Sequence, residues 1–483
     1  MINRSFLQIA QMIGSQIPEG EYQVLMIHGV STDSRKLEQG NLFVPIAGER
    51  FDGHLFVEEA FARGAAAALW QSDHGTPPEG RPILVVDDTI RGLQTLAWRY
   101  REQLSARIVG ITGSNGKTTT KDMIASILST TYNVHKTEGN LNNHIGLPLT
   151  LLQMDEDTEM AVLEMGMSGR GEIELLSRLA QPEAAVITNI GESHLLQLGS
   201  REEIAKAKLE IVRGMKADGL LVYNGDEPLL SRLLDNSEEA TLSDESQAAS
   251  EDRIVLPPEL KTFRFGRSVR NDFYPSGIMI DSEQHRTYFT LNVPNSANYV
   301  LPLLGQHNVI NALAAIAVSK YMGVSEADIV RGLKSLKTTG MRIEIVKGIT
   351  GLTILNDAYN ASPTSMKAAI ELLGEMKGYA KKIAVLGDML ELGKDEEEFH
   401  REIGRLLDPR NIDYIFTYGR LAESIAEEAA KRFEPGRVHA AEHKSDIAKR
   451  IASIASPGDL VLAKASRGMK FEEIVNELAD ISI

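Results

Sequence analysis

The 483-residue sequence contains no cysteine, which excludes disulfides, thiolate metal sites and cysteine nucleophiles. No apolar run reaches the roughly 20 residues that a membrane-spanning helix needs. The first ten residues, MINRSFLQIA, also lack the long apolar core of a signal peptide. From these absences we expect a cytoplasmic protein without membrane insertion.

The sequence also has fewer positively than negatively charged residues. The chain carries 51 Lys and Arg against 67 Asp and Glu, a formal net charge of −16. This balance argues against a nucleic-acid partner, because phosphate backbones are bound by a surplus of cations. An anionic small molecule must therefore be held by local cations against the overall field. The hydrophobic content of 43% is that of an ordinary globular protein, and the length predicts two to four domains.

The most informative stretch joins a short apolar run, residues 107–112, to a helical pattern through the sequence GSNGKTT. Gly113 and Gly116 let the backbone curl so that successive N–H groups point inward, and a helix N-terminus adds partial positive charge behind them. Lys117 can reach the terminal phosphates of a nucleotide, and the Thr118 hydroxyl can bind Mg²⁺. The order of strand, glycine turn and helix predicts a nucleotide-phosphate site, with ATP as the ligand.

The match to the eight-residue P-loop pattern is incomplete, since Ile111 stands where the first glycine is expected. A tight strand-to-helix turn with a coincidental Lys-Thr pair is the alternative. The strand before the turn and the helix after it favour the phosphate site. The residues that we assign to the nucleotide here are Gly113, Ser114, Asn115, Gly116, Lys117, Thr118 and Thr119.

Apolar strands alternate with helical segments over most of the chain, which predicts an α/β fold with parallel, doubly wound sheets. We expect three domains: a small N-terminal α/β module (1–104), a central P-loop domain with a mostly parallel sheet (105–338) and a C-terminal Rossmann-like domain (339–483). The expected strands of the two larger domains are 107–112, 160–166, 184–190, 219–224, 353–359, 382–388, 414–419 and 459–466. Residues 235–252 are acidic and nearly free of bulky apolar groups, so we expect a solvated insertion there.

Two residues lie at the carboxyl ends of central strands, which is the edge of a parallel sheet where ligands bind. Glu164 ends the strand 160–166, and its place beside the phosphate loop favours a magnesium ligand over a helix-capping partner. His194 follows the strand 184–190. A lone histidine is often structural, but this position favours a functional role.

The segment 201–215 has the spacing of an amphipathic helix. Lys208 falls on its apolar face, so we expect it in the interior. Lys206 and Glu210 point away from that face, and we expect Lys206 to be solvated. Burial disfavours an ammonium and lowers its pKa from the usual value of about 10.4. A neutral amine beside metal and phosphate could react with carbon dioxide and give a carbamate that ligates Mg²⁺. A lysine that reaches solvent over apolar surface is the alternative, and the pattern does not decide between the two.

Further polar residues lie at element boundaries. Asn308 and Asn311 are three residues apart at a helix start, so their amides share a face that could recognise an adenine edge; a role in starting the helix is the alternative. Arg342 begins the third domain, and an arginine from a hinged domain can neutralise charge on a transferring phosphoryl group. An ordinary surface arginine is the alternative.

In the N-terminal module a polar cluster follows a strand. It consists of Ser31, Asp33, Ser34 and Arg35. The cluster is either a capped turn or a ligand-binding loop in which Arg35 pairs with a phosphate, and both interpretations stay open.

Together these segments resemble the Mur ligase family. The family-like stretches, which occur in all three regions, are TDSR, FDGH, TGSNGKTT, TEGNLNNHIGLPLTLL, LEMGMSGRGEI, ITNIGESHL, AKAKLEI, GQHNVINA, NDAYNASPTS, VLGDMLELG and ASRGMKFE. The phosphate loop is common to Mur ligases and folylpolyglutamate synthetases. The pair NLNNHIGLP and NDAYNA resembles the members that add D-alanyl-D-alanine.

The resemblance implies an ATP-dependent amide ligase of peptidoglycan precursor synthesis. Phosphate would move from ATP to the terminal carboxylate of a UDP-N-acetylmuramoyl-tripeptide, and the amine of D-alanyl-D-alanine would attack the acyl phosphate, releasing ADP and phosphate. A ligase that adds a single amino acid to a UDP-muramoyl or folate acceptor is one alternative. A non-catalytic, ATP-gated binding protein is the other. We expect a monomer.

The resemblance also implies roles for residues at matching positions. The implied catalytic residues are Lys117, His194, Lys208 and Arg342. The implied ligands of two Mg²⁺ ions are Thr118, Glu164, His194 and Lys208, the last as an N6-carboxylated lysine. The ATP contacts beyond the phosphate loop would be Asn308, Asn311, Arg342 and Asp357. The substrate contacts would be Ser31, Asp33, Ser34, Arg35, Asn140, Asn142, Asn143, Tyr359 and Asn360.

The sequence departs from the family pattern at two places on the expected dipeptide side. Ser362 stands where asparagine is usual, and Ala465 replaces a usual glycine. We expect both to retune dipeptide binding without touching the phosphoryl chemistry.

Overall fold

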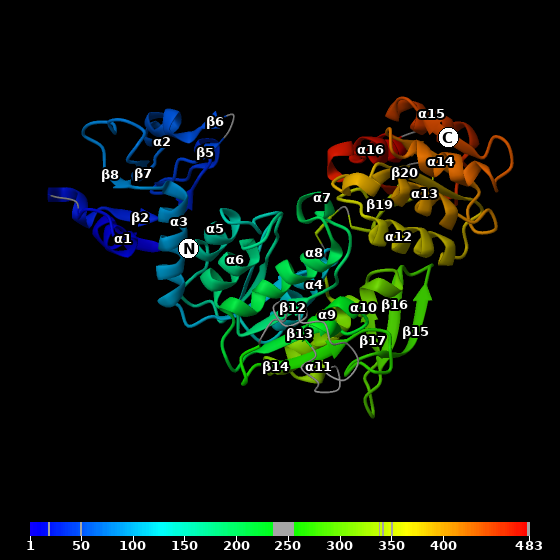
Figure 1. Cartoon of the computed structure of the whole chain (residues 1–483), viewed down its shortest axis with the longest axis horizontal. Coiled ribbons are helices and arrows are strands. Elements are labelled where there is room, and N and C mark those ends of the chain that lie inside the picture. The colour runs from blue at the N-terminus through cyan, green and yellow to red at the C-terminus, as the bar shows by residue number, and fades with distance from the viewer. Residues whose placement is uncertain are drawn as a thin grey trace, which may run out of the picture.

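The structure, a computed structural model, describes residues 1–17, 20–48, 51–234, 256–337, 339–340, 342–348 and 351–480. The expected acidic insertion, 235–252, lies outside the described residues. Figure 1 shows an N-terminal group of elements in blue and a C-terminal group in yellow to red, each joined to a central group in cyan and green. The predicted α/β class with three domains is confirmed, while the two boundary positions stay predictions.

The N-terminal part is built on a parallel sheet of order β3-β4-β7-β8. Its strands are β3 (Val30–Ser31), β4 (Leu42–Phe43), β7 (Ala67–Gln71) and β8 (Ile83–Val86). Two antiparallel pairs, β1 (Asn3–Ser5) with β2 (Met26–His28) and β5 (Ala47–Gly48) with β6 (Phe51–Asp52), flank it. The helices are α1 (Phe6–Ile13), α2 (Val57–Ala62) and α3 (Thr89–Glu102).

The N-terminal and central parts share one apolar core. On α3, Leu93, Leu96 and Tyr100 are fully buried in the same cluster as Leu147 and Leu151 of the central part. Burial of that much apolar surface is the main favourable term in holding two elements together. The N-terminal sheet is therefore fixed to the central domain through α3.

The central domain has a six-stranded parallel sheet of order β10-β11-β9-β12-β13-β14. Its strands are β9 (Arg107–Thr112), β10 (Val134–Lys136), β11 (Met160–Glu164), β12 (Ala184–Ile187), β13 (Leu220–Asn224) and β14 (Lys261–Phe265). Its helices are α4 (Lys117–Leu128), α5 (Gly146–Leu152), α6 (Glu172–Ala180), α7 (Leu195–Leu198), α8 (Arg201–Leu209), α9 (Pro228–Leu234), α10 (Gln306–Tyr321) and α11 (Glu326–Lys334).

Strand β9 lies between β11 and β12, so the phosphate loop has the ends of both neighbours beside it. Ile108 faces one apolar cluster and Val109 the other, as expected for a sheet that helices cover on both faces. The four strands predicted for this domain are confirmed as β9, β11, β12 and β13, and their ends lie within three residues of the predicted ends. The sequence did not predict β10, β14 or the antiparallel sheet β15 (Pro275–Asp281), β16 (Arg286–Leu291) and β17 (Tyr299–Leu301).

The C-terminal domain has a second six-stranded sheet, of order β18-β19-β23-β20-β21-β22, in which only the edge strand β18 is antiparallel. Its strands are β18 (Glu344–Lys347), β19 (Thr353–Asp357), β20 (Lys382–Gly387), β21 (Tyr414–Tyr418), β22 (Val438–Ala441) and β23 (Leu460–Lys464). Its helices are α12 (Pro363–Glu375), α13 (Glu396–Leu406), α14 (Glu423–Ala430), α15 (Lys444–Ile454) and α16 (Glu472–Asp480).

The four strands predicted for this domain form the middle of its sheet. The two edge strands, β18 and β22, were missed because they are short and largely uncovered, so they lack the buried apolar run that marks the others. Within the described part of the chain, no helix combines the length and apolarity needed to cross a membrane.

Candidate active site

The phosphate loop connects β9 to α4, as the sequence predicted. Gly113 and Gly116 adopt positive φ angles of 146° and 80°. A Cβ on Gly113 would lie 1.8 Å from Oγ1 of Thr188, which follows β12, so only glycine fits there. The glycine turn is therefore required both by the backbone conformation and by the close approach of the neighbouring strand.

Residues after β12 hold the loop in shape. The backbone N–H of Asn115 donates to Oδ1 of Asn189 over 2.9 Å, and the N–H of Gly191 donates to Oγ of Ser114 over 2.8 Å. Thr188 Oγ1 donates to the carbonyl of Asn115 over 2.5 Å. Thr188 was not predicted as a site residue, and Asn189 was given no specific role. The polar run that directly follows a buried strand is the signal that identifies both.

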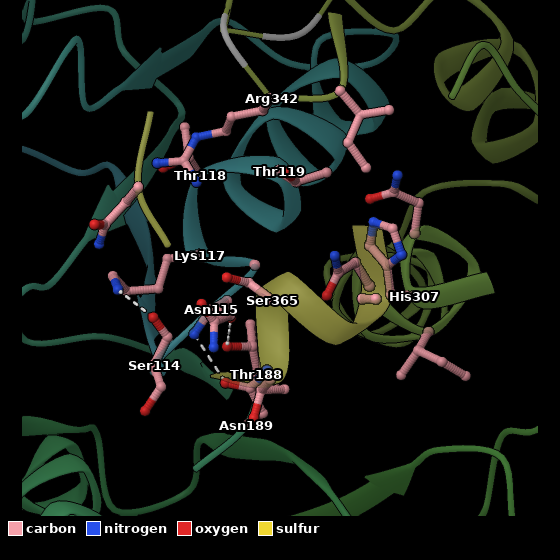
Figure 2. A pocket seen from close by; sticks show the side chains of 18 of the residues that line it. Ser114, Asn115, Lys117, Thr118, Thr119, Thr188, Asn189, His307, Arg342 and Ser365 are labelled. Atoms are coloured by element: carbon pink, nitrogen blue, oxygen red, sulfur yellow. Dashed lines mark hydrogen bonds between the residues drawn. The ribbon is translucent and has the colours of Figure 1, made fainter. Parts of the chain in front are cut away.

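Lys117 begins α4 and folds back over the loop. Its Nζ donates to the carbonyl of Gly113 over 2.8 Å. Burial lowers the pKa of Lys117 from its usual value, the carboxylate of Glu164 opposes that effect, and the charge of Arg342 adds to it. Two cations from different domains thus act on the same space, where Figure 2 places Lys117 and Arg342 near Thr118. This is a site for a strongly anionic group.

Glu164, at the end of β11, is 3% exposed and fully engaged. Thr118 Oγ1 donates to its Oε2 over 2.8 Å, and Asn142 Nδ2 donates to its Oε1 over 2.9 Å. A hydroxyl and a carboxylate beside a phosphate loop are the oxygen ligands that Mg²⁺ prefers. The residues present therefore fit a magnesium ion.

Lys208 on α8 is 2% exposed, so its predicted burial is confirmed. That burial lowers the pKa of Lys208 well below its usual value, and the charge of Lys117 adds to the effect. His194, just before α7, has a pKa lowered by burial and by the charges of both lysines. The charge of Lys117 thus acts on both His194 and Lys208, and the lowered pKa values favour the neutral forms of the Lys208 amine and the His194 imidazole.

The expectations for two other residues of this segment were wrong. The α-helix ends at Leu209 and continues as a 3₁₀ turn over Glu210–Gly214, which changes the face that the later side chains present. Glu210 is therefore buried and accepts from Nε of Arg170 over 2.9 Å. The side chain of Lys206 is only 12% exposed, and its Nζ lies 3.1 Å from Oε1 of Glu203.

The cleft in front of the phosphate loop has a volume of about 340 Å³ and is lined by both larger domains. From the C-terminal side, the Arg342 guanidinium stacks 4.2 Å from the ring centroid of Tyr359. Asp357 lies 2.5 Å from Nζ of Lys464, which also donates to the carbonyl of Asn360 over 3.1 Å. The structure thus brings together four C-terminal residues that the sequence assigned, and adds Lys464.

The other end of the cleft is formed by the start of α10 (Figure 2). Asn308 Nδ2 donates to the carbonyl of Leu304 over 2.7 Å, and Asn311 lies so close to the loop that a Cβ on Gly116 would be 2.7 Å from its Oδ1. His307 also lines the cleft, and burial lowers its pKa to about 4. His307 and Lys464 were missed, although a lysine that ends an apolar run, as in LVLAK, signals a buried ion pair.

Of the three assigned asparagines before α5, only Asn142 lines the cleft. Asn143 Oδ1 accepts from the N–H groups of Ile145 and Gly146, at 3.1 and 2.8 Å, in the turn that leads into α5. Asn140 is exposed in the preceding turn. Ala465, expected on the dipeptide side, is fully buried beside Gly387 and does not line the cleft.

The N-terminal polar cluster lies outside the cleft. Asp33 begins a 3₁₀ turn (Ser34–Lys36) and accepts from Nε and Nη2 of Arg35, both over 2.9 Å. These hydrogen bonds from Arg35 lower the pKa of Asp33 to about 2. Ser31 Oγ accepts from the N–H of Asp33 over 3.2 Å. The capped turn is therefore present, and ligand binding by these residues stays a prediction.

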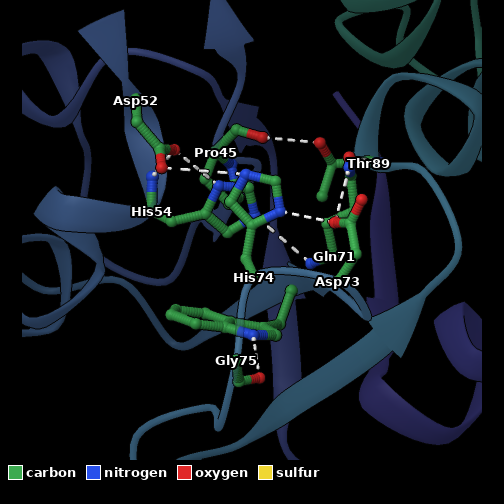
Figure 3. A network of polar contacts seen from close by, with 9 residues as sticks. Pro45, Asp52, His54, Gln71, Asp73, His74, Gly75 and Thr89 are labelled. Atoms are coloured by element: carbon green, nitrogen blue, oxygen red, sulfur yellow. Dashed lines mark hydrogen bonds and ion pairs between the residues drawn. The ribbon is translucent and has the colours of Figure 1, made fainter.

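A second polar cluster, Asp52, His54 and His74, is the one group of three or more potential metal ligands found in the described ranges (Figure 3). The N–H of Gln71 donates to Nε2 of His54 over 3.2 Å, so Nδ1 carries the proton and donates to Asp52 over 2.8 Å. A metal would have to displace one of these bonds. The arrangement is better explained as a network that joins β6 to β7.

Family models match three successive stretches of the chain. The Mur ligase family catalytic domain matches residues 26–101, the Mur ligase middle domain matches 111–319, and the Mur ligase glutamate ligase domain matches 341–467. Two relatives are named UDP-N-acetylmuramoyl-tripeptide–D-alanyl-D-alanine ligase. That of Bacillus subtilis (strain 168) is 52% identical over 481 residues, and that of Escherichia coli (strain K12) is 35% identical over 483 residues, with 99% of each chain covered in both cases.

Solved structures agree. The crystal structure of MurF from Acinetobacter baumannii superposes with a TM-score of 0.83 at 31% identity, covering 99% of both chains. MurF ligase from Thermotoga maritima in complex with ADP gives a TM-score of 0.79 at 29% identity, covering 94% of this chain and 97% of that one. The resemblance inferred from the motifs is confirmed: this chain belongs to the Mur ligase family.

Proposed function

We infer that this protein is an ATP-dependent ligase that adds D-alanyl-D-alanine to UDP-N-acetylmuramoyl-tripeptide in peptidoglycan precursor synthesis. The observation that carries this function is full-length similarity, 52% identity over 99% of both chains, to a relative of that name. The site supports it independently, because a phosphate loop faces Arg342 and Lys464 of a second domain across one cleft. That arrangement suits a reaction in which a nucleotide and an acid meet between domains.

Activation of the acid is the step for which the cleft is suited. A carboxylate oxygen of the tripeptide attacks the γ-phosphorus of ATP, the bond to the β,γ-bridging oxygen breaks, and ADP leaves. The loop N–H groups and Lys117 hold the phosphates, while Arg342 balances the charge of the transferring group from the C-terminal side. The dipeptide amine then attacks the acyl carbon, and inorganic phosphate leaves with the C–O bond electrons.

We propose that Thr118, Glu164, His194 and Lys208 hold two magnesium ions beside the phosphates. Magnesium bound by these residues would neutralise phosphate charge and orient the reacting oxygens. The 2.8 Å distance between Thr118 Oγ1 and Glu164 Oε2 supports the first magnesium site. For Lys208 we propose an N6-carboxylated side chain. Its support is the burial that favours a neutral amine, which is the form that reacts with carbon dioxide.

The remaining assignments follow the division into domains. We propose that Asn308, Asn311 and Asp357 contact the adenosine, and that Tyr359, Asn360 and Asn142 lie on the side of the acceptor and dipeptide. The UDP-sugar would bind the N-terminal residues Ser31, Asp33, Ser34 and Arg35. We also propose that the enzyme acts in the cytoplasm, where ATP is supplied, and as a monomer, since one chain completes the cleft.

A coupled ADP-release assay with defined UDP-N-acetylmuramoyl-tripeptides tests this function. We expect ADP release that depends on both the tripeptide and D-alanyl-D-alanine, with lysine and diaminopimelate acceptors compared side by side. Release that is supported equally by a single amino acid or by glutamate on a folate would favour another ligase. Tight ATP binding without turnover on any amine would favour a binding protein.

A further inference from the structure

Across the domain boundary, Glu391 of the C-terminal domain meets His194 of the central domain. Nδ1 of His194 lies 3.1 Å from Oε2 of Glu391. Nδ1 is buried and has no hydrogen-bond partner among the described residues. The carboxylate of Glu391 is therefore an acceptor within reach of a buried ring nitrogen that is otherwise without a partner among the described residues.

The backbones at this contact are specifically joined. The N–H of Leu196 donates to the carbonyl of Glu391 over 3.1 Å. His194 and Glu391 both have a φ of +65°, a left-handed conformation that non-glycine residues keep only where the surroundings hold them there. In Figure 1, α7 projects from the central domain toward the C-terminal elements. A chance meeting of two surface side chains would not need this backbone geometry.

The segment that carries Glu391 is anchored in its own domain. The N–H of Met389 donates to Nε2 of His400 over 2.9 Å, and the N–H of Leu390 donates to Oγ of Ser466, also over 2.9 Å. The position of Glu391 therefore follows the position of the whole C-terminal domain. When that domain moves relative to the phosphate loop, the carboxylate moves with it.

Histidines that bind metals usually donate their second ring N–H to a carboxylate or carbonyl, which fixes the tautomer and orients the ring. With Nδ1 toward Glu391, Nε2 is the nitrogen left for a metal. We propose that Glu391 is a positioning residue for His194, so that docking of the C-terminal domain completes the magnesium site of the central domain. This inference rests on the proposed function, in which His194 is a metal ligand.

The test measures Mn²⁺ binding, by electron paramagnetic resonance, to the full-length enzyme with the non-hydrolysable nucleotide AMP-PNP. We expect Glu391→Ala to weaken the affinity for Mn²⁺ at least about 10-fold, as removal of such orienting carboxylates generally does. Glu391→Gln should lose less, because its amide oxygen still accepts the N–H. The matched control is Glu398→Ala, which removes a carboxylate from an exposed ion pair with Arg405 on the same domain.

His194→Ala and the double variant of His194→Ala with Glu391→Ala distinguish failure of the positioning role of Glu391 from failure of the metal role of His194. If the inference holds, His194→Ala weakens Mn²⁺ binding and the added Glu391→Ala change weakens it no further. If His194→Ala weakens binding while Glu391→Ala behaves like Glu398→Ala, the positioning role is overturned and the metal site stands. If His194→Ala keeps the affinity of the unmodified enzyme, the metal role of His194 fails, and this inference fails with it.

Discussion

Ser362 Oγ, at the start of α12, donates a hydrogen bond to Oδ1 of Asn115 in the phosphate loop over 3.2 Å. The two side chains belong to different domains, and Ser362 is only 2% exposed. A neighbouring bond, from Thr364 Oγ1 to Oε2 of Glu192 over 2.9 Å, crosses the same boundary. The C-terminal domain is thus attached directly to the loop that we assign to the phosphates of ATP.

Replacing Ser362 tests this attachment. Ser362→Ala removes the bond to Asn115 and also the helix cap, since Ser362 Oγ accepts from the N–H of Ser365. We expect a loss of about 1 kcal/mol of stability from the cap and a several-fold rise in KM for ATP from the lost contact. Steady-state kinetics and thermal melting measure the two effects.

Ser325→Ala is the control for the cap alone. Ser325 caps α11 in the same way, accepting from the N–H of Asp328 over 3.2 Å, but it lies outside the cleft. It should lower the melting temperature similarly and leave KM for ATP unchanged. Equal KM values for the two variants would show that the contact with Asn115 does not affect nucleotide binding.

Lys208→Ala should abolish ligation, because the variant removes the amine that we propose to be carboxylated. We expect a rate at least about 100-fold lower, and partial recovery when short carboxylic acids such as acetate are added to occupy the vacated space. Lys206→Ala, on the same helix but paired with Glu203 instead, should retain most activity. Full activity in Lys208→Arg or Lys208→Gln would rule out the carbamate.

His307 should make stability depend on pH. Its pKa is about 4 in the folded protein and about 6.5 when unfolded, so the unfolded chain binds more protons between these values. Stability therefore falls as pH drops from about 6.5 to 4, by up to about 1.4 kcal/mol per pH unit. Melting temperatures measured over this range should decline less steeply in His307→Gln. Parallel declines in the two proteins would contradict the assignment.

Asp357 and Lys464 should behave as a coupled pair. Lys464 is only 2% exposed, so Lys464→Met leaves the Asp357 carboxylate without its buried cation. We expect this change to lower the free energy of unfolding by about 3 kcal/mol. The double variant Asp357→Asn with Lys464→Met should recover much of that stability but not the affinity for ATP. A double-mutant cycle by thermal melting and nucleotide titration measures both. Additive losses of stability would mean that the two side chains do not interact.

The phosphate loop, Glu164 and the burial of Lys208 could be predicted because each depends on local pattern. A glycine turn between strand and helix, a carboxylate at a strand end and a lysine on an apolar helical face are all visible along the chain. The turn of Glu210 into the interior could not be predicted, since nothing local marks the change to a 3₁₀ turn after Leu209.

Contacts between domains could not be predicted from the sequence, for a different reason. The meeting of Ser362 with Asn115 depends on how two separately folded sheets dock, which no periodicity encodes. The same holds for Glu391 beside His194. For Asn143 the substrate role stays a prediction, and the structure adds that its Oδ1 accepts from the backbone N–H of Gly146, the first residue of α5.

The proposed reaction requires ATP to phosphorylate the tripeptide's carboxylate before the amide bond forms. Tripeptide labelled with ¹⁸O in its terminal carboxylate, supplied with ATP and D-alanyl-D-alanine, tests it by mass spectrometry of the released phosphate. We predict that one ¹⁸O is transferred to inorganic phosphate in each turnover. Unlabelled phosphate, or release of AMP and pyrophosphate, would contradict the account.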